Sequence, residues 1–297
     1  MEWRKGRRSD NVVDARGEGG GGGGMRFGGG KGLGLGAILL IVGIGWLTGQ
    51  DPLQILGQLA GQMEQQQTQV APSGAGGKAP PANDQQAEFV ASILGDTEDT
   101  WKALFAEAGK QYRDPKLVLF SGQVNSACGF ASAGVGPFYC PADQRVYLDM
   151  SFFREMETRF AAAGDFAQAY VIAHEIGHHV QTLLGVSAKV DAARRNGQRM
   201  EGDNGLLVRQ ELQADCLAGV WAYQAQKRLN WLEPGGVEEA LNAANAIGDD
   251  RLQQQGRGRV VPDSFTHGTS AQRVRWFKAG FAQGEVNSCD TFSARNL

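Results

Sequence analysis

Hydrophobic and polar positions divide the chain into four stretches of different character. Residues 1–31 combine basic side chains with a run of glycines and offer too little apolar surface to fold, so we expect a disordered tail. Residues 32–50 carry no charge and are rich in leucine, isoleucine and glycine. Residues 51–85 are dominated by Gln, Ala, Pro and Gly, which is typical of a flexible linker. Helical and strand spacing of apolar side chains then predicts one folded domain over residues 86–297.

The uncharged stretch 32–50 is just long enough to cross a bilayer as one helix, and Trp46 near its end fits an interfacial anchor. Seven lysines and arginines precede it, from Arg4 to Lys31, and the first charge after it is Asp51. The positive-inside rule therefore predicts a single-pass protein of the cytoplasmic membrane, with its N-terminus in the cytoplasm and its domain on the periplasmic side. A cleaved signal peptide is the alternative, although its apolar core is normally shorter and no A-x-A cleavage motif follows.

Within the domain, the spacing of apolar residues predicts helices around a small sheet. Residues 89–94 have helical spacing, and residues 95–97 should end this helix and cap a second one that carries residues 101–105. Short apolar runs at 117–120 and 145–150 predict strands. The expected fold class is therefore α+β, mostly helical with a small sheet, behind a transmembrane helix.

Composition and charge limit the classes of binding partner that we expect. The chain has 297 residues and a formal net charge of −3, which gives no overall sign of nucleic-acid binding. The basic cluster at residues 4–8 has no folded scaffold in this prediction, and no G-x-x-x-x-G-K-[ST] phosphate loop occurs. We therefore expect no nucleic acid among the partners, and a membrane contact through residues 32–50.

The strongest chemical signal lies in residues 169–181, which contain three of the four histidines of the chain. His174, Glu175 and His178 form H-E-x-x-H, and on a helix the two histidines lie one turn apart on the same face. Both imidazoles can then bind one Zn²⁺, while Glu175 acts as general base on a water at the open coordination position. Apolar neighbours on both sides favour a buried helix over an exposed one with scattered histidines.

A catalytic zinc site needs a third protein ligand. Leu184 stands where some zincins place a third histidine, so we expect a carboxylate. Glu211 and Asp215 lie four residues apart on an apolar helix and would be costly to bury without partners. We assign Glu211 to the metal and Asp215 to the outer N–H of a ligand imidazole, which orients the ring. A solvated face is the other interpretation of this pair, and Glu201 and Asp203 are rival ligands.

The four cysteines are Cys128, Cys140, Cys216 and Cys289, and all follow the predicted membrane segment. On the outer side of the membrane we expect them to form two disulfides. Three pairings are open; local loop closure favours Cys128 with Cys140, which leaves Cys216 with Cys289. Zinc binding by cysteine is an alternative without a C-x-x-C motif, and a free buried thiol is an alternative for Cys216.

These motifs resemble those of a known family. The two metal motifs, together with residues 3–12, 136–141, 146–149 and 265–270, resemble the gluzincin metallopeptidases and, more closely, the bacterial neutral zinc metallopeptidase family. The resemblance covers most of the chain outside the linkers. It implies an N-terminally anchored zinc hydrolase with an α+β, zincin-like (gluzincin) fold, and it leaves the substrate open.

His267 is the one histidine outside the zinc-site stretch. The segment around His267 resembles a Thr-His-Pro segment in membrane proteases of the CAAX-processing type. In those proteases the segment contributes a histidine near the zinc. In this chain Gly268 follows the histidine instead of proline. We expect His267 or Arg273 to stabilise the oxyanion that forms when a peptide carbonyl is attacked. A capping or surface role for His267 is the alternative.

Two functions of different classes fit these residues. The first is a zinc endopeptidase that acts on peptides or unfolded proteins outside the cytoplasmic membrane. The second is a catalytically idle, zinc-stabilised scaffold that binds partners in the cell envelope. The enzyme is favoured because a purely structural zinc site needs no general base and usually has four protein ligands.

Overall fold

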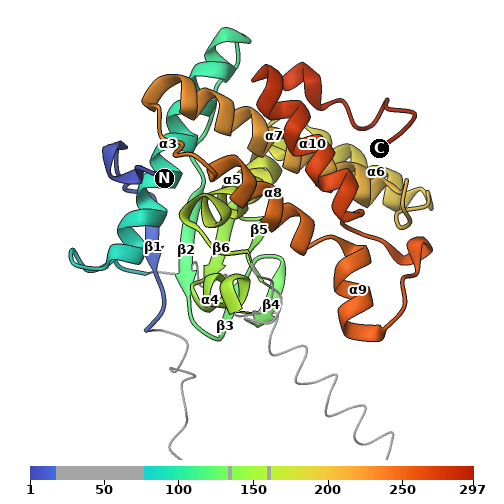
Figure 1. Cartoon of the computed structure of the whole chain (residues 1–297), viewed down its shortest axis with the longest axis horizontal. Helices are drawn as coiled ribbons and strands as arrows, with labels where there is room; N and C mark the ends of the chain where they lie inside the picture. The colour runs from blue at the N-terminus through green and yellow to red at the C-terminus, as the bar shows by residue number, and fades with distance from the viewer. Residues whose placement is uncertain (18–76, 133–135, 159–161) are drawn as a thin grey trace, which may run out of the picture. The chain divides into compact units, whose positions relative to one another are not determined.

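A mixed four-stranded sheet joins strands from distant parts of the chain (Figure 1). The computed structural model describes residues 1–17, 77–132, 136–158 and 162–297. In order across the sheet, the strands are β1 (Val12–Asp14), β2 (Lys116–Phe120), β6 (Arg145–Asp149) and β5 (Phe138–Cys140). The first three run parallel, and β5 pairs antiparallel with β6. Both strands expected from the sequence, β2 and β6, are buried along almost their whole length, as central strands should be.

A separate antiparallel hairpin follows β2. It consists of β3 (Gln123–Ser126) and β4 (Gly129–Ser132). The disulfide between Cys128 and Cys140 joins the turn of this hairpin to β5, the edge strand of the main sheet. The hairpin and the sheet edge are therefore covalently linked.

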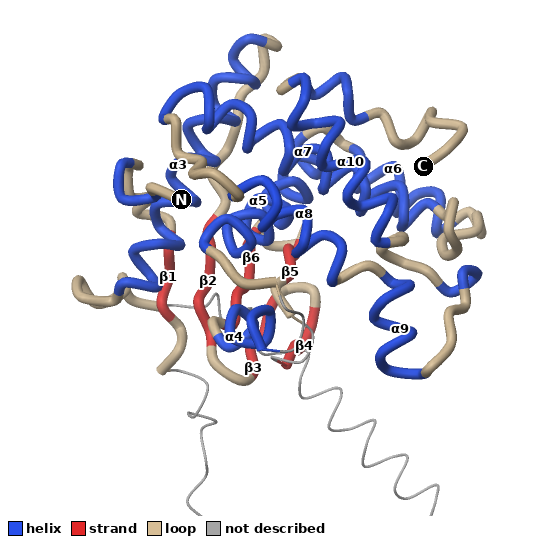
Figure 2. Tube along the Cα trace, viewed as in Figure 1, coloured by secondary structure: helices blue, strands red, loops and turns tan. Residues whose placement is uncertain are grey.

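The helices contact one another extensively and bury most of the core. Their bounds are α3 (Gln85–Glu107), α4 (Ser151–Thr158), α5 (Asp165–Leu183), α6 (Val186–Arg195), α7 (Leu206–Leu229), α8 (Gly236–Ala246), α9 (Asp249–Arg257) and α10 (Ser270–Gln283), with 3₁₀ turns η1 (Trp3–Lys5), η3 (Pro262–Ser264) and η4 (Val286–Cys289). Helix α7 packs against both α5 and α10, and a disulfide between Cys216 and Cys289 joins it to η4. Helix α5 also contacts β5 and β6, so it lies between the sheet and α7 (Figure 2). The described domain is α+β.

Helix α3 runs unbroken through residues 95–97, where the sequence predicts the end of one helix and the start of another. A Cβ atom on Gly95 would lie 2.6 Å from the backbone oxygen of Arg7, so only glycine permits this close approach. Asp96 is buried and accepts a hydrogen bond of 2.8 Å from Trp221. Both apparent helix breakers are therefore used for tertiary contacts of one long helix.

Residues 1–17 are folded onto the domain, which corrects the prediction of a disordered tail for this part of the chain. Strand β1 pairs with β2, and Trp3 packs edge-on against Phe89 with only 7% of its surface exposed. Arg7 donates a hydrogen bond of 2.6 Å to Glu98, whose side chain is 1% exposed. The basic cluster is thus partly neutralised by carboxylates of α3, and it holds the N-terminal segment in place.

The prediction of a transmembrane helix at residues 32–50 is wrong, and with it the single-pass topology that puts the N-terminus in the cytoplasm and the domain on the periplasmic side. That stretch and most of the predicted linker 51–85 lie outside the described residues. In the part that the structure does describe, no helix is long and apolar enough to span a bilayer. Strands β1 and β2 flank the stretch and are hydrogen-bonded neighbours. One crossing between them would place these paired strands on opposite sides of a membrane.

Candidate metal centre

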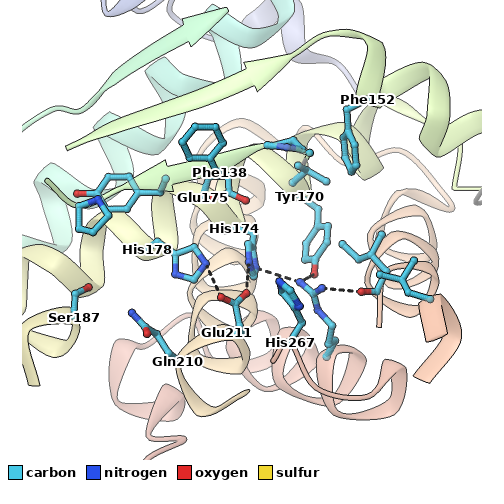
Figure 3. A pocket seen from close by; sticks show the side chains of 18 of the residues that line it. Phe138, Phe152, Tyr170, His174, Glu175, His178, Ser187, Gln210, Glu211 and His267 are labelled. Carbon is cyan, nitrogen blue, oxygen red and sulfur yellow. Dashed lines mark hydrogen bonds and ion pairs between the residues drawn. The ribbon is translucent and has the colours of Figure 1, made fainter. Parts of the chain in front are cut away.

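Helix α5 carries the H-E-x-x-H motif through the interior of the domain. It begins at Asp165 and ends at Leu183, and most of its side chains are buried because it contacts the sheet as well as other helices. His174 and Glu175 are only 7% and 8% exposed. His174 and His178 lie one turn apart, so their imidazoles project to the same side of the helix (Figure 3).

A glycine in the motif lets α7 approach α5 closely. A Cβ atom on Gly177 would lie 3.0 Å from the backbone oxygen of Ala214, which is tighter than nine in ten real contacts of a Cβ atom. Glu211 precedes Ala214 by three residues on α7 and points toward His174 and His178 (Figure 3). The backbone of α7 therefore occupies the space that the missing side chain leaves.

The ligand atoms of His174, His178 and Glu211 lie within 4.8 Å of one another. One carboxylate oxygen of Glu211 is 3.2 Å from Nε2 of His174, and the other is 3.4 Å from Nε2 of His178. A tetrahedral zinc ion with ligand distances of about 2.1 Å would separate its ligand atoms by about 3.4 Å. Spacing and donor types therefore fit one Zn²⁺, with a fourth position left for water or substrate. In the described ranges, no other such group of His, Cys, Asp and Glu occurs.

The charges around this cluster favour a cation. Burial alone would lower the pKa of His174, but the carboxylates of Asp215 and Glu211 outweigh that effect and raise it to about 10. Burial would raise the pKa of Glu211, yet the imidazoles of His178 and His174 keep it well below its usual value. Positive charge is thus stabilised at the rings, and a metal ion competes with protons for the same nitrogens.

A buried ionic network supports His174. Asp215 is fully buried and accepts a hydrogen bond of 2.8 Å from Nδ1 of His174. Arg273 on α10 donates to both oxygens of this carboxylate, at 2.9 and 3.0 Å, and the hydroxyl of Tyr170 donates to one of them. Burial alone would raise the pKa of Asp215, but Arg273 and His174 lower it to about 2. Asp215 therefore stays ionised and fixes the tautomer of His174 that leaves Nε2 free for a metal.

The partner of His178 was not predicted from the sequence. Nδ1 of His178 lies 2.9 Å from Oε1 of Gln181, which is fully buried. The amide nitrogen of Gln181 donates to the backbone oxygen of Gln210 at 2.7 Å and to the side chain of Gln213 at 3.0 Å. Gln213 in turn donates to the backbone oxygen of Cys289 at 3.0 Å. A chain of neutral amides thus orients His178, and the only sequence signal for it is a glutamine three residues after the ligand.

A cleft of about 650 Å³ opens onto the cluster. Glu175 lines this cleft, and Figure 3 shows it beside Phe138 of the edge strand β5. Within the described chain, no group donates a hydrogen bond to its carboxylate, so both oxygens are available to water or substrate. Tyr139 of β5 also lines the cleft, and its hydroxyl lies 3.0 Å from Nδ1 of His179. The sheet edge and the motif helix therefore form adjoining walls of one site.

His267 enters the same cleft from the loop between α9 and α10. One oxygen of the buried Asp249 accepts hydrogen bonds from the backbone N–H groups of Thr266, His267 and Gly268, and the other lies 3.2 Å from Nδ1 of His267. The side chain of His267 is 51% exposed, and its partial burial alone would lower its pKa, but Asp249 contributes most to raising the pKa above the usual value. Thr269 caps α10, so the capping role considered for His267 is not needed.

Other residues singled out in the sequence lie elsewhere. Arg273 lines the cleft, but it is 2% exposed and its guanidinium is bound to Asp215, so it is poorly placed to meet a substrate. Glu201 and Asp203, the rival ligands, are exposed in the turn before α7 and are not part of the cluster.

A model of the family described as "Putative neutral zinc metallopeptidase" matches residues 1–292. The chain belongs to this family. It is 50% identical over 294 residues to "Uncharacterized protein YpfJ" from Escherichia coli strain K12, which covers 98% of this chain and 99% of the relative. It is 48% identical over 207 residues to "Uncharacterized protein Mb2605" from Mycobacterium bovis, which covers 66% of this chain and 67% of the relative. No solved structure gives a significant match.

Membership of the neutral zinc metallopeptidase family confirms the resemblance seen in the sequence. It implies Zn²⁺ as the metal and peptides as the class of substrate, and the two imidazoles and one carboxylate described above are suitable ligands for that ion. The matched region starts at residue 1, so the family pattern includes the N-terminal segment that packs against α3 and β2.

Proposed function

We propose that this member of the family is a zinc-dependent endopeptidase that hydrolyses peptide bonds in peptides or unfolded proteins. The observation that supports this most is the meeting of His174, His178 and Glu211 in one cluster, with Glu175 beside it in an open cleft. A zinc ion that only stabilises a fold normally has four protein ligands. Three donors that face a cleft are typical of a catalytic site.

Each residue then has a defined role. His174 and His178 bind the metal through Nε2, and Glu211 binds it through its carboxylate. When bound, Zn²⁺ supplies Lewis acidity, which polarises a carbonyl group and lowers the pKa of a water molecule. Glu175 takes the proton of the attacking water and passes it to the departing amine. Its place next to His174 on a buried helix fixes its position relative to the ligands.

His267 is proposed to stabilise the negative charge that develops on the carbonyl oxygen. Because Nδ1 of His267 faces Asp249, the Nε2–H of the protonated ring remains available to donate to that oxygen. The carboxylate of Asp249 contributes most to raising the pKa of His267, which favours the protonated ring. Asp249 is then a positioning residue, since it holds both the loop and the ring.

The Glu175→Gln variant of the full chain tests the proposal. The substitution keeps the size of the side chain and removes its ability to accept a proton. We expect unchanged zinc content and a loss of hydrolysis of about 10²- to 10⁴-fold, measured on a fluorogenic peptide library and an unfolded protein. Glu107→Gln, at the exposed end of α3, is the matched control and should cleave at the wild-type rate.

Hydrolysis by Glu175→Gln at the wild-type rate would contradict the assignment of the general base. Wild-type protein that binds zinc and cleaves neither substrate would favour the scaffold function instead.

A further inference from the structure

We propose that one end of the cleft is a subsite for a large apolar side chain of the substrate, at a position next to the bond that is cut. The inference rests on the proposed peptidase function and adds the class of residue that the enzyme selects. Four apolar side chains from different elements line the cleft, namely Phe152 on α4, Val171 on α5, Ile247 after α8 and Leu252 on α9. Phe152 lies at this end with Tyr170 (Figure 3), and Arg273 donates hydrogen bonds both to the hydroxyl of Tyr170 and to the backbone oxygen of Ile247. Helix α9, which carries Leu252, contacts α8 and α10.

The two ends of the cleft differ in chemistry. Figure 3 shows Phe152 and Tyr170 on one side of His174, His178 and Glu211. Ser187 and Gln210 lie on the other side. The second side is lined by α6 and the start of α7, which contribute polar and charged side chains. An extended peptide that crosses the cluster would therefore meet an apolar surface on one side of the scissile bond and a polar surface on the other.

Leu252 on α9 gives the strongest support for an apolar subsite. It is the only large apolar side chain among the nine residues of α9, a helix otherwise made of charged residues, glutamines and one glycine. It is 37% exposed, and it faces the cleft rather than the core. A lone exposed leucine would need no explanation, but Leu252 lines the same cleft as Phe152, Val171 and Ile247, and covering such a group with a substrate side chain is favourable.

The charged groups near this end do not cancel the apolar character. The guanidinium of Arg273 is buried and its charge is matched by Asp215 through two hydrogen bonds. Glu155 lies one turn after Phe152 on α4 and also lines the cleft. Its carboxylate makes a preference for basic side chains the competing outcome of any specificity measurement.

The apolar end and the group of His174, His178 and Glu211 belong to one cleft of about 650 Å³. The expected occupant of the apolar end is therefore a side chain of the peptide whose bond is cut. That volume is in the range of sites that enclose most of a small ligand, and it can hold a few residues of a peptide. Family membership independently implies a peptide substrate.

A cleavage profile of the zinc-loaded full chain on a peptide library tests the subsite. For the wild type we expect Leu, Phe or Met to dominate one position that flanks the scissile bond. Leu252→Lys should lower kcat/KM for these peptides about tenfold and favour Asp or Glu at that position, whereas Leu252→Glu should favour Lys or Arg. Gln255→Lys adds the same charge at an exposed position of α9 outside the cleft, and it should leave the profile unchanged.

Phe152→Ala is a further variant that removes apolar surface contributed by α4, and it should weaken the same preference. An unchanged profile in all three cleft variants would overturn the proposal. A wild-type preference for Lys or Arg that the Leu252 variants do not alter would also overturn it, and would assign the selection to Glu155.

Peptide binding to zinc-loaded Glu175→Gln separates this proposal from the proposed function. Tighter binding of a Phe-containing peptide than of its Glu-containing counterpart, lost in a double variant with Leu252→Lys, supports the subsite even where the wild type does not cleave. Equal binding of both peptides contradicts the subsite and leaves the peptidase assignment intact.

Discussion

The two histidines that we propose as metal ligands lie one turn apart on α5, yet the protein supports them in different ways. His174 is supported by a buried ion pair: its Nδ1 donates a hydrogen bond to Asp215, and Arg273 donates to the same carboxylate. His178 is supported by neutral amides: its Nδ1 contacts the side-chain oxygen of Gln181, and the amide nitrogen of Gln181 donates to the backbone oxygen of Gln210 on α7. Both partners fix the ring so that Nε2 faces the cluster.

The difference between the two supports shows what a charged partner adds beyond orienting the imidazole ring. A carboxylate behind an imidazole makes the ring a stronger electron donor, while an amide only directs its N–H. A second buried carboxylate behind His178 would need its own cation, and Arg273 already serves Asp215. We infer that Asp215 contributes to both folding and metal binding, whereas Gln181 contributes mainly to metal binding.

Asp215→Ala should have the largest effect on stability, because it leaves the guanidinium of Arg273 buried without its counter-charge. We expect a loss of about 3–5 kcal/mol in the free energy of unfolding, measured by denaturant titration of the metal-free full chain at neutral pH. The pKa of Asp215 is lowered to about 2 from the usual 3.8, so its stabilising effect is present above pH 4 and disappears as the pH falls through 2. The difference between wild type and variant should shrink over that window.

Asp263→Ala is the control for this prediction, since Asp263 is 89% exposed and should tolerate the change. A loss for Asp215→Ala no larger than that of the control would show that the ionic network does not stabilise the fold.

Gln181→Ala should have an intermediate effect, concentrated on the metal. Without its acceptor, the ring of His178 loses its fixed orientation, and removal of such a partner typically lowers metal affinity by about 10- to 100-fold. Competition with a zinc chelator measures this affinity. If the metal-free Gln181→Ala chain instead lost as much unfolding free energy as Asp215→Ala, the proposed contrast between the two supports would fail.

Asp249→Asn should have the smallest effect, and it extends the comparison to a histidine outside the cluster. Asp249 raises the pKa of His267, so the protonated ring persists to a higher pH than that of a free histidine. Removing the charge should return this pKa toward its usual value, and the alkaline limb of kcat/KM should move to lower pH. If the alkaline limb did not move, the protonation of His267 would not set the pH dependence of kcat/KM.

The sequence predicts those parts of the site that depend on local spacing or on simple burial arguments. His174 and His178 are brought together by the helix repeat alone. Glu211 and Asp215 could be placed because two carboxylates on an apolar helix require partners. Gln181 has no comparable signal, since a glutamine on a helix is usually solvated. The role of Arg273 depends on the packing of α10 against α7, which no local pattern specifies.

The N-terminal segment shows why the remaining predictions failed. Arg7 resembles a residue of a disordered basic tail, but its partner Glu98 is 91 positions away in the chain. The positive-inside argument treated such charges as free, although Arg7 is bound to α3 and Arg16 to Asp84. The sheet register between β1 and β2 is a long-range contact as well. Composition near residues 32–50 therefore could not reveal that both flanks belong to one fold.

Zinc titration of the metal-free full chain, compared between wild type and Glu211→Gln, tests the central claim most directly. We expect one ion per wild-type chain and an affinity for Glu211→Gln that is lower by on the order of 100-fold or more, since the variant removes a direct ligand. Glu201→Gln, at the exposed rival position, should bind zinc like the wild type. Wild-type affinity in Glu211→Gln would contradict the account, because the ion would then be held by residues other than this cluster.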